Sequence, residues 1–245
     1  MKRNIKIHYY EELESTNKAL KEMAKNGAEE GTVIIAKKQT DGKGRLGRSF
    51  CSKEGGLYMS LLLKPQIPPE KALQITACAA VATAEAIESV TGTVCGIKWV
   101  NDLFLNGKKI CGILTEGAII PDRSMLDYAV LGIGVNVYPS KNGFPDELKS
   151  IAGAIYDEPQ ENDIIKKLAE EIIKRFFDYY DKGDTTYIEK YRRRSILIGK
   201  EVSYIKDSLS HSGKVLGIDE NASLIIKENG KTVKLSAGEV SVKLN

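Results

Sequence analysis

The apolar pattern of the chain changes its period near residue 194, and this change constrains the fold more than any other feature. Beyond it, apolar and polar residues alternate in five short runs separated by turns: EVSYI, GKVLGI, SLIIK, TVKL and EVSVK. A period of two indicates strands, and the Asn229-Gly230 dipeptide is typical of a tight hairpin turn. We therefore expect two domains, residues 1–194 and a small five-stranded barrel of residues 195–245 that leans on the larger one.

The first 194 residues mix strand and helix patterns. Apolar runs bounded by turn residues indicate strands over 5–12, 32–36, 57–63, 95–99, 109–120 and 125–138, with a long loop over 37–56. Turns are expected at Asn106-Gly107 and Pro121-Asp122. Helices are expected after the cap Ser15-Thr16-Asn17, over 70–90, and over 161–182 with Asn162 as its cap. This order indicates an α+β fold, a mixed sheet with helices packed on it.

Composition argues against several classes of protein. We expect no membrane-spanning segment, because we find no apolar run of the roughly 20 residues that cross a bilayer. We expect no signal peptide either, because the N-terminus turns acidic before an apolar core could form. The default location is therefore the cytoplasm, with no membrane partner. Four cysteines without a C-x-x-C pair and two distant histidines indicate neither a disulfide framework nor a zinc site. A net charge of only +3 does not favour DNA as a partner.

The segment from Gln39 to Arg48, QTDGKGRLGR, places cations among glycines. Its glycines match the G-x-G-x-x-G dinucleotide fingerprint, but that motif must open a helix and a strand is expected here. A P-loop fails for the same reason, and because Arg48 stands where its lysine belongs. What remains is a flexible loop whose cations and backbone N–H groups suit a phosphate or a carboxylate. A solvated basic loop is the alternative.

A lysine at a predicted strand end is the second candidate. Lys98 lies between apolar Ile97 and Trp99, so its ammonium is expected to leave the strand into a protected place, where one charge acts more strongly than in water. Asn101 and Asp102 could orient that group or help to hold magnesium. The alternative is an exposed lysine followed by an ordinary Asn-Asp turn.

The third candidate is a strand with two glycines, Gly132 and Gly134, and a polar residue, Asn136, at its exit. Glycines inside a strand indicate that a ligand or another chain segment approaches closely. A simple bulge explains them equally well.

Taken together, these segments resemble the catalytic domain of the biotin protein ligase family in content and order. The matching segments are Glu14-Ser15-Thr16-Asn17, Gln39 with GKGRLGR, GGLYMSLLL, IKWVNDLFLNGKKICGILTEG and VLGIGVNV. The C-terminal strands resemble the SH3-like domain of the family. The resemblance implies a catalytic domain like that of class II aminoacyl-tRNA synthetases. It also implies an enzyme that uses ATP and Mg²⁺ to make biotinyl-5'-AMP and transfers biotin to a lysine of a biotin carboxyl carrier domain.

The resemblance also implies a role for each matching residue, with Lys98 and Arg45 as the catalytic groups. The residues that would bind the ureido ring of biotin are Ser15, Thr16, Asn17 and Gln39. Those that would close over its carboxylate and the adenylate phosphate are Lys43, Gly44, Arg45 and Lys98. Those that would receive ATP are Arg48, Phe50, Asn101 and Asn136. No tightly bound metal or prosthetic group is expected, and the metal ligands stay open.

Four positions depart from the usual family residues. Lys43 stands where the family usually has arginine, and lysine keeps the positive charge but lacks the planar, forked guanidinium group. Phe50 stands where the family usually has tryptophan, and phenylalanine keeps an aromatic face for adenine but lacks the indole N–H. Lys53 and Val100 stand where proline is common. We expect these changes to alter binding strength rather than identity.

Three other functions stay open. A lipoate or octanoate ligase would use the same adenylation, but the polar cap residues favour a ureido ring over a plain acyl chain. A non-catalytic biotin-binding protein is disfavoured by the presence of Lys98 and Arg45. A repressor would need a helix-turn-helix ahead of the ligase segment, which already begins by Ser15. A homodimer is possible.

Overall fold

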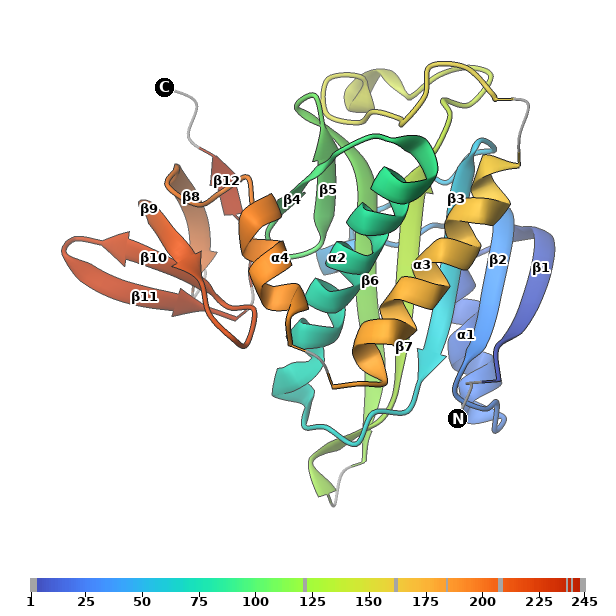
Figure 1. Ribbon diagram of the computed structural model, residues 1–245, viewed down its shortest axis with the longest axis horizontal. Helices are drawn as coiled ribbons and strands as arrows, with labels where there is room; N and C mark the ends of the chain where they lie inside the picture. The colour runs from blue at the N-terminus through green and yellow to red at the C-terminus, as the bar shows by residue number, and fades with distance from the viewer. Residues whose placement is uncertain are drawn as a thin grey trace.

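The computed structural model describes residues 4–120, 123–160, 163–183, 185–206, 209–236, 238 and 240–242. Within these residues it has two sheets, and Figure 1 shows the smaller one standing beside the larger. The larger sheet has seven strands in the order β1-β2-β3-β7-β6-β5-β4. The smaller has five in the order β11-β10-β9-β8-β12.

The larger sheet is mixed, as expected. Its strands are β1 (Lys6–Leu13), β2 (Thr32–Gln39), β3 (Gly56–Leu63), β4 (Gly96–Lys98), β5 (Asp102–Leu105), β6 (Lys108–Ile120) and β7 (Met125–Asn136). β1 and β2 run parallel and are joined through helix α1 (Thr16–Lys25), whereas the other neighbours are antiparallel. A parallel pair needs such a crossover, because a two-residue turn can join only antiparallel strands.

Helices cover both faces of this sheet. α2 (Ala72–Thr91) and α3 (Ile164–Tyr180) lie side by side on one face, and α1 lies on the other (Figure 1). β3 is buried along its whole length, because its alternate residues face the two helix layers. Leu61 packs in the cluster under α2 and α3, whereas Leu62 packs with Leu20 of α1.

Helix α2 corrects one expectation. With the turn before it, it forms an apolar helix of 23 residues, Pro69–Thr91, which is long enough to cross a membrane. However, 67% of its most apolar stretch is buried within the protein, so it is a core helix. Gly92, at φ 72°, takes the left-handed conformation that ends it.

The C-terminal residues form the expected small β domain. Its strands are β8 (Glu201–Lys206), β9 (Leu209–Ile218), β10 (Leu224–Glu228), β11 (Lys231–Leu235) and β12 (Val240–Val242). Asn229 and Gly230 have φ of 48° and 78°, the positive values that a type I′ hairpin needs. Asn106 and Gly107 do the same in the larger sheet, at 50° and 77°. Both hairpin predictions are confirmed.

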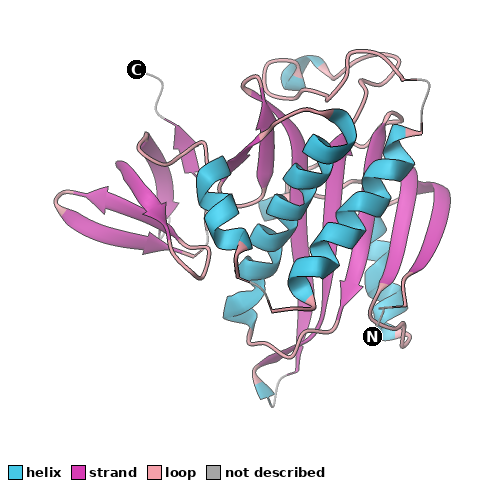
Figure 2. Cartoon of the chain, in the orientation of Figure 1, coloured by secondary structure: helices cyan, strands magenta, loops and turns pink. Residues whose placement is uncertain are grey.

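A helix that the sequence did not predict, α4 (Tyr187–Arg194), lies between α2 and the smaller sheet (Figure 2). Two hydrogen bonds join the larger sheet to the segments beyond α4: Trp99 Nε1 donates to Ala222 O at 2.8 Å, and Ile196 N to Ile97 O at 3.0 Å. The smaller sheet therefore leans on the larger domain. The division at residue 194 stays a prediction.

Two expected features lie outside the described residues, the cap at Asn162 and the turn at Pro121-Asp122. The N-cap of α3 is instead Asp163, whose side chain accepts a hydrogen bond from Lys166 N at 3.1 Å. The helix thus begins one residue later than the Asn162 cap implied.

Candidate functional site

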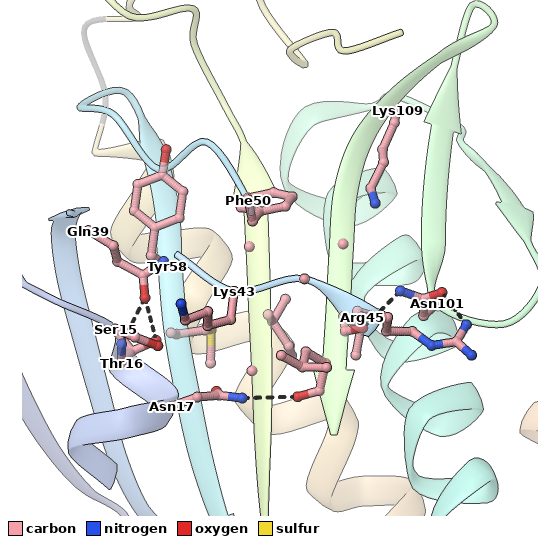
Figure 3. A pocket seen from close by; sticks show the side chains of 18 residues that line it. Ser15, Thr16, Asn17, Gln39, Lys43, Arg45, Phe50, Tyr58, Asn101 and Lys109 are labelled. Atoms are coloured by element: carbon pink, nitrogen blue, oxygen red, sulfur yellow. Dashed lines mark hydrogen bonds between the residues drawn. The ribbon is translucent and has the colours of Figure 1, made fainter. Parts of the chain in front are cut away.

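A pocket opens over β3, β6 and β7, on the face of the larger sheet that carries α1 (Figure 3). With its open mouth, which is filled by solvent, it measures about 480 Å³. It brings together most of the residues that the sequence singled out, namely Ser15, Thr16, Asn17, Gln39, Lys43, Gly44, Arg45, Phe50 and Asn101. The described lining includes no carboxylate and no histidine. Its ionisable charges are therefore cations.

One end of the pocket is built from buried polar side chains at the start of α1. Ser15 caps the helix, because its hydroxyl accepts a hydrogen bond from Lys18 N. Gln39 Oε1 accepts from the backbone N–H of Thr16 at 2.7 Å and from its hydroxyl at 3.1 Å. Ser60 Oγ lies 2.8 Å from the Thr16 hydroxyl. These groups are oriented by the protein itself, which lowers the entropy cost of binding a polar ligand there.

Asn17 is held on several sides. Its Oδ1 accepts from Ser60 at 2.6 Å, and its Nδ2 donates to Leu114 O at 3.3 Å and to Glu116 at 2.8 Å. A Cβ at Gly132 would lie 2.3 Å from Asn17 Oδ1, so glycine is needed for this approach. Asn17 therefore fastens α1 to the sheet. Its predicted contact with the ureido ring stays a prediction.

The aromatic ring of Phe50 lies on two glycines of neighbouring strands. A Cβ would come within 3.0 Å of the ring at Gly112 and within 2.6 Å at Gly134, and these two residues are register partners in β6 and β7. The β6–β7 register shifts only at Ala118 and Ile119, so the bulge explanation for the β7 glycines is wrong. Glycine at the two β7 positions lets the side chains of Asn17 and Phe50 approach the sheet closely.

The glycine-rich loop leads into a strand rather than a helix, which confirms that it is neither a dinucleotide fingerprint nor a P-loop. It closes on itself through a hydrogen bond of 2.7 Å from Gly44 N to Arg48 O. Arg45 donates to Asn101 Oδ1 and to Gly238 O, both at 3.1 Å, and Lys43 pairs with Asp41. The loop thus brings two cations to the mouth of the pocket.

Three predicted residues do not line this pocket. Lys98 Nζ lies 5.7 Å from the ring centroid of Phe104, and Arg48 is exposed. Asn136 donates to Gly153 O at 2.9 Å and lines a second hollow next to the first. Their roles toward ATP and biotin stay predictions.

The lining also includes residues that were not singled out from the sequence, among them Tyr58 and Lys109. Burial raises the pKa of the Tyr58 phenol well above its ordinary value, so it stays neutral and donates a hydrogen bond to Lys53 O. Lys109 comes from β6 and faces Phe50, at 5.8 Å from the ring centroid. Both lie in segments quoted for the family resemblance, but nothing in the residue pattern distinguished them.

The comparisons with known proteins agree with this geometry. The model of the biotin/lipoate A/B protein ligase family matches residues 9–136. The chain is 38% identical to the bifunctional ligase/repressor BirA of Bacillus subtilis, over 96% of this chain and 73% of that one. It is 31% identical to the biotin–[acetyl-CoA-carboxylase] ligase of Mycobacterium tuberculosis, over 92% of this chain and 85% of that one.

Among solved structures, the biotin protein ligase from Aquifex aeolicus in complex with biotin and ATP superposes with a TM-score of 0.80. It is 28% identical, and the match covers 98% of this chain and 99% of that one. The likeness extends over both sheets, which confirms the expected fold, a mixed sheet with helices followed by an SH3-like domain. On the family match and the two relatives, the chain belongs to the biotin/lipoate A/B protein ligase family.

Proposed function

We propose that this protein is a biotin protein ligase, which makes biotinyl-5'-AMP from biotin and ATP and transfers biotin to a lysine of a biotin carboxyl carrier domain. One observation carries the proposal: a single pocket has a buried polar end at Thr16 and Gln39 and a cationic mouth beside an aromatic ring. The relatives named as biotin ligases support the activity. The carrier domain as acceptor follows from the same names by analogy.

The polar end suits a ureido ring better than the dithiolane of lipoate. A ureido group offers two N–H donors and a carbonyl acceptor, which match the hydroxyl of Thr16 and the amide of Gln39. These groups already bond one another, so a ureido ring would add hydrogen bonds through their remaining lone pairs and N–H groups, which a plain acyl chain cannot do. The order of polar end and cations supports a biotin that points its carboxylate toward the mouth.

The first step joins two anions. A carboxylate oxygen of biotin attacks the α-phosphorus of ATP, and pyrophosphate leaves with the electrons of the broken P–O bond. Such a step needs fixed positive charge more than it needs a base. Lys43 and Arg45 supply charge from the loop, which fits the absence of a carboxylate from the described lining.

The second step needs a dry site. The amine nitrogen of the acceptor lysine attacks the acyl carbon, the C–O bond to phosphate breaks, and AMP leaves with its electrons while the amine proton passes to solvent. Water competes with the amine for the same carbon, so the loop that carries Arg45 has to stay closed until the acceptor arrives. Its contacts with Asn101 and Gly238 support that role.

Magnesium fits as a companion of the nucleotide rather than as a resident ion. No group of three or more acidic, cysteine or histidine side chains that could hold a metal occurs among the described residues. Asp102 does not line the pocket, and its Oδ1 pairs with the Lys109 ammonium at 2.7 Å, so only its other oxygen could face an ion. One or two carboxylates together with substrate phosphates are the usual way that proteins hold Mg²⁺. When bound, the ion would neutralise phosphate charge.

The test is incubation of the protein with labelled biotin, ATP, Mg²⁺ and a biotin carboxyl carrier domain, with lipoate and a lipoyl acceptor domain in parallel. We expect label on the carrier lysine and release of pyrophosphate, with biotin only. Preference for lipoate would transfer the assignment to the other branch of the family. Biotin binding without release of pyrophosphate would show a binding protein and would contradict the proposal.

A further inference from the structure

Ser52 lies behind the polar end of the pocket, where its hydroxyl contacts one of the residues that form that end. It is buried, at 3% exposure, and it lies between the glycine-rich loop and β3. Its Oγ accepts a hydrogen bond from Gln39 Nε2 at 2.8 Å, and its carbonyl accepts from Gln39 N at 2.9 Å. Ser52 therefore holds Gln39 by side chain and backbone, although it does not line the pocket.

Backbone groups fix the direction of the hydrogen bonds around the Gln39 amide. Thr16 N can only donate, so the amide atom that faces it at 2.7 Å has to be Oε1 (Figure 3). Nε2 then faces Ser52, whose hydroxyl has to accept, because an amide N–H₂ only donates. The one proton of that hydroxyl is left for Phe50 O, at 3.0 Å. The hydroxyl of Ser52 is thus locked between an obligatory donor and an obligatory acceptor.

The same chain of hydrogen bonds decides what the Thr16 hydroxyl can offer to a ligand. Its Oγ1 lies 3.1 Å from Gln39 Oε1, which only accepts, so the single proton of Thr16 is donated there. Ser60, at 2.8 Å, can use one of the two lone pairs of Thr16 Oγ1, which leaves the other for the pocket. The wall at Thr16 therefore accepts hydrogen bonds, and it suits a ligand N–H rather than a ligand carbonyl.

Gly42 leaves room for these contacts of Ser52. A Cβ at this position would lie 2.4 Å from Ser52 Oγ, 2.4 Å from Phe50 O and 3.1 Å from Gln39 Nε2. Gly42 is not among the residues with a positive φ, so its backbone conformation does not require glycine. The three atoms that would meet the added Cβ are the three that the Ser52 hydrogen bonds join. One glycine of the loop is therefore explained by this arrangement and not by a turn.

We propose that Ser52 is a positioning residue for biotin, because it holds the Gln39 amide and, through it, keeps the Thr16 hydroxyl ready to accept from a ureido N–H. The inference rests on the proposed function, since it concerns how that substrate is recognised. A buried amide that loses its acceptor either stays unsatisfied or moves, and both outcomes disturb its bonds to Thr16. Site residues hold their geometry when such supporting hydrogen bonds lock them.

The test measures binding of biotin and of a non-hydrolysable ATP analogue, each alone, by calorimetry. Ser52→Ala removes the acceptor of Gln39 Nε2. Gln39→Met keeps the length of the side chain and removes its hydrogen bonds, and the double variant completes a double-mutant cycle. The matched control is Ser223→Ala, the same substitution at a buried serine of the smaller domain.

We expect Ser52→Ala to weaken biotin binding about 2- to 12-fold, the range for one neutral hydrogen bond. In the Gln39→Met background the same substitution should cost less than about 2-fold, because the bond is already absent. Nucleotide binding should stay close to that of the parent, since Phe50 N keeps its bond of 2.8 Å to Gly42 O. Ser223→Ala should bind both ligands as the parent does. A purely structural role for Ser52 would instead weaken biotin and nucleotide alike, with or without Gln39.

The inference is overturned if Ser52→Ala binds biotin as Ser223→Ala does, if its loss persists in the Gln39→Met background, or if both ligands weaken together. These measurements need no turnover, so they separate the inference from the ligase proposal. A parent protein that binds biotin and nucleotide but releases no pyrophosphate contradicts the ligase proposal alone. A parent that binds no biotin contradicts both.

Discussion

Gly134→Ala tests the packing of Phe50 on the sheet. A Cβ at this position would lie 2.6 Å from Cε1 and 3.0 Å from Cζ of the ring. Carbon atoms normally pack at about 3.5–4.0 Å, so the ring has to move by roughly 1 Å. Gly134 has no positive φ in the structure, so alanine fits the backbone itself and the effect comes from the ring.

The expected change in the free energy of unfolding is the difference between two opposing contributions. Overpacking typically costs about 1–3 kcal/mol, and Gly→Ala returns about 0.4–1 kcal/mol by reducing the entropy of the unfolded chain. We expect the free energy of unfolding to fall by about 1–2 kcal/mol. Because Phe50 is proposed to face adenine, the KM for ATP should rise more than the KM for biotin.

A double-mutant cycle in urea unfolding measures the contact. In a Phe50→Ala background the ring is absent, so Gly134→Ala should cost little there, which gives a coupling energy of about 0.5–3 kcal/mol. The control is Gly217→Ala in β9, where no atom lies within 4 Å of the added Cβ. Equal losses of stability with and without the ring would refute the reasoning, as would a Gly134 variant as stable as the Gly217 one.

Three further predictions use other parts of the chain. Lys98→Ala should slow biotinyl-AMP formation about 10²–10³-fold, since the flexible lysine side chain can leave the Phe104 ring and reach the pocket. A near-normal rate of biotinyl-AMP formation would show that Lys98 does not supply the positive charge for this step. Arg45→Gly should allow biotin activation but release biotinyl-AMP, measured as free adenylate and as biotin on unrelated proteins, and equal leakage from the parent would contradict the role of the loop. Although burial opposes it, hydrogen bonds from Lys234, Ser223 N and Asn221 N hold the pKa of the Asp219 carboxyl below its ordinary value. Asp219→Asn should therefore lower stability above about pH 4 by roughly 1 kcal/mol, and the difference should vanish as the pH falls through the lowered pKa; a pH-independent difference in thermal unfolding would exclude this cause.

The elements that the sequence predicted well have strong local signals. Alternating runs gave the strands of the smaller sheet, and Asn-Gly dipeptides gave both hairpins because few residues accept positive φ. α4 was missed because it is short and ends in three arginines, and only Tyr187, Ile188 and Tyr191 are buried. Packing against α2 and the smaller sheet stabilises it, and that packing has no local signature.

The site was predicted where family motifs mark it and missed where geometry decides. Lys109 reaches the pocket because Ile110 is an extra residue in β6, and a bulge cannot be located from the alternation of side chains when both neighbours are apolar. The glycines of β7 were correctly noticed, but the partners that need them, Asn17 and Phe50, come from distant segments. Such pairings exist only in the folded sheet.

The bond from Arg45 to the smaller sheet has a consequence for how the protein can vary in evolution. Its acceptor is the carbonyl of Gly238, and every residue type has a carbonyl, so no partner side chain would change together with Arg45. Covariation between aligned sequences would therefore not reveal this contact. What position 238 does restrict is its own residue type, because its φ of 116° is one that L-amino acids rarely adopt. In a saturation mutagenesis screen, the contact would appear as a loss of function for substitutions at Gly238, which is far in sequence from the residues of the pocket.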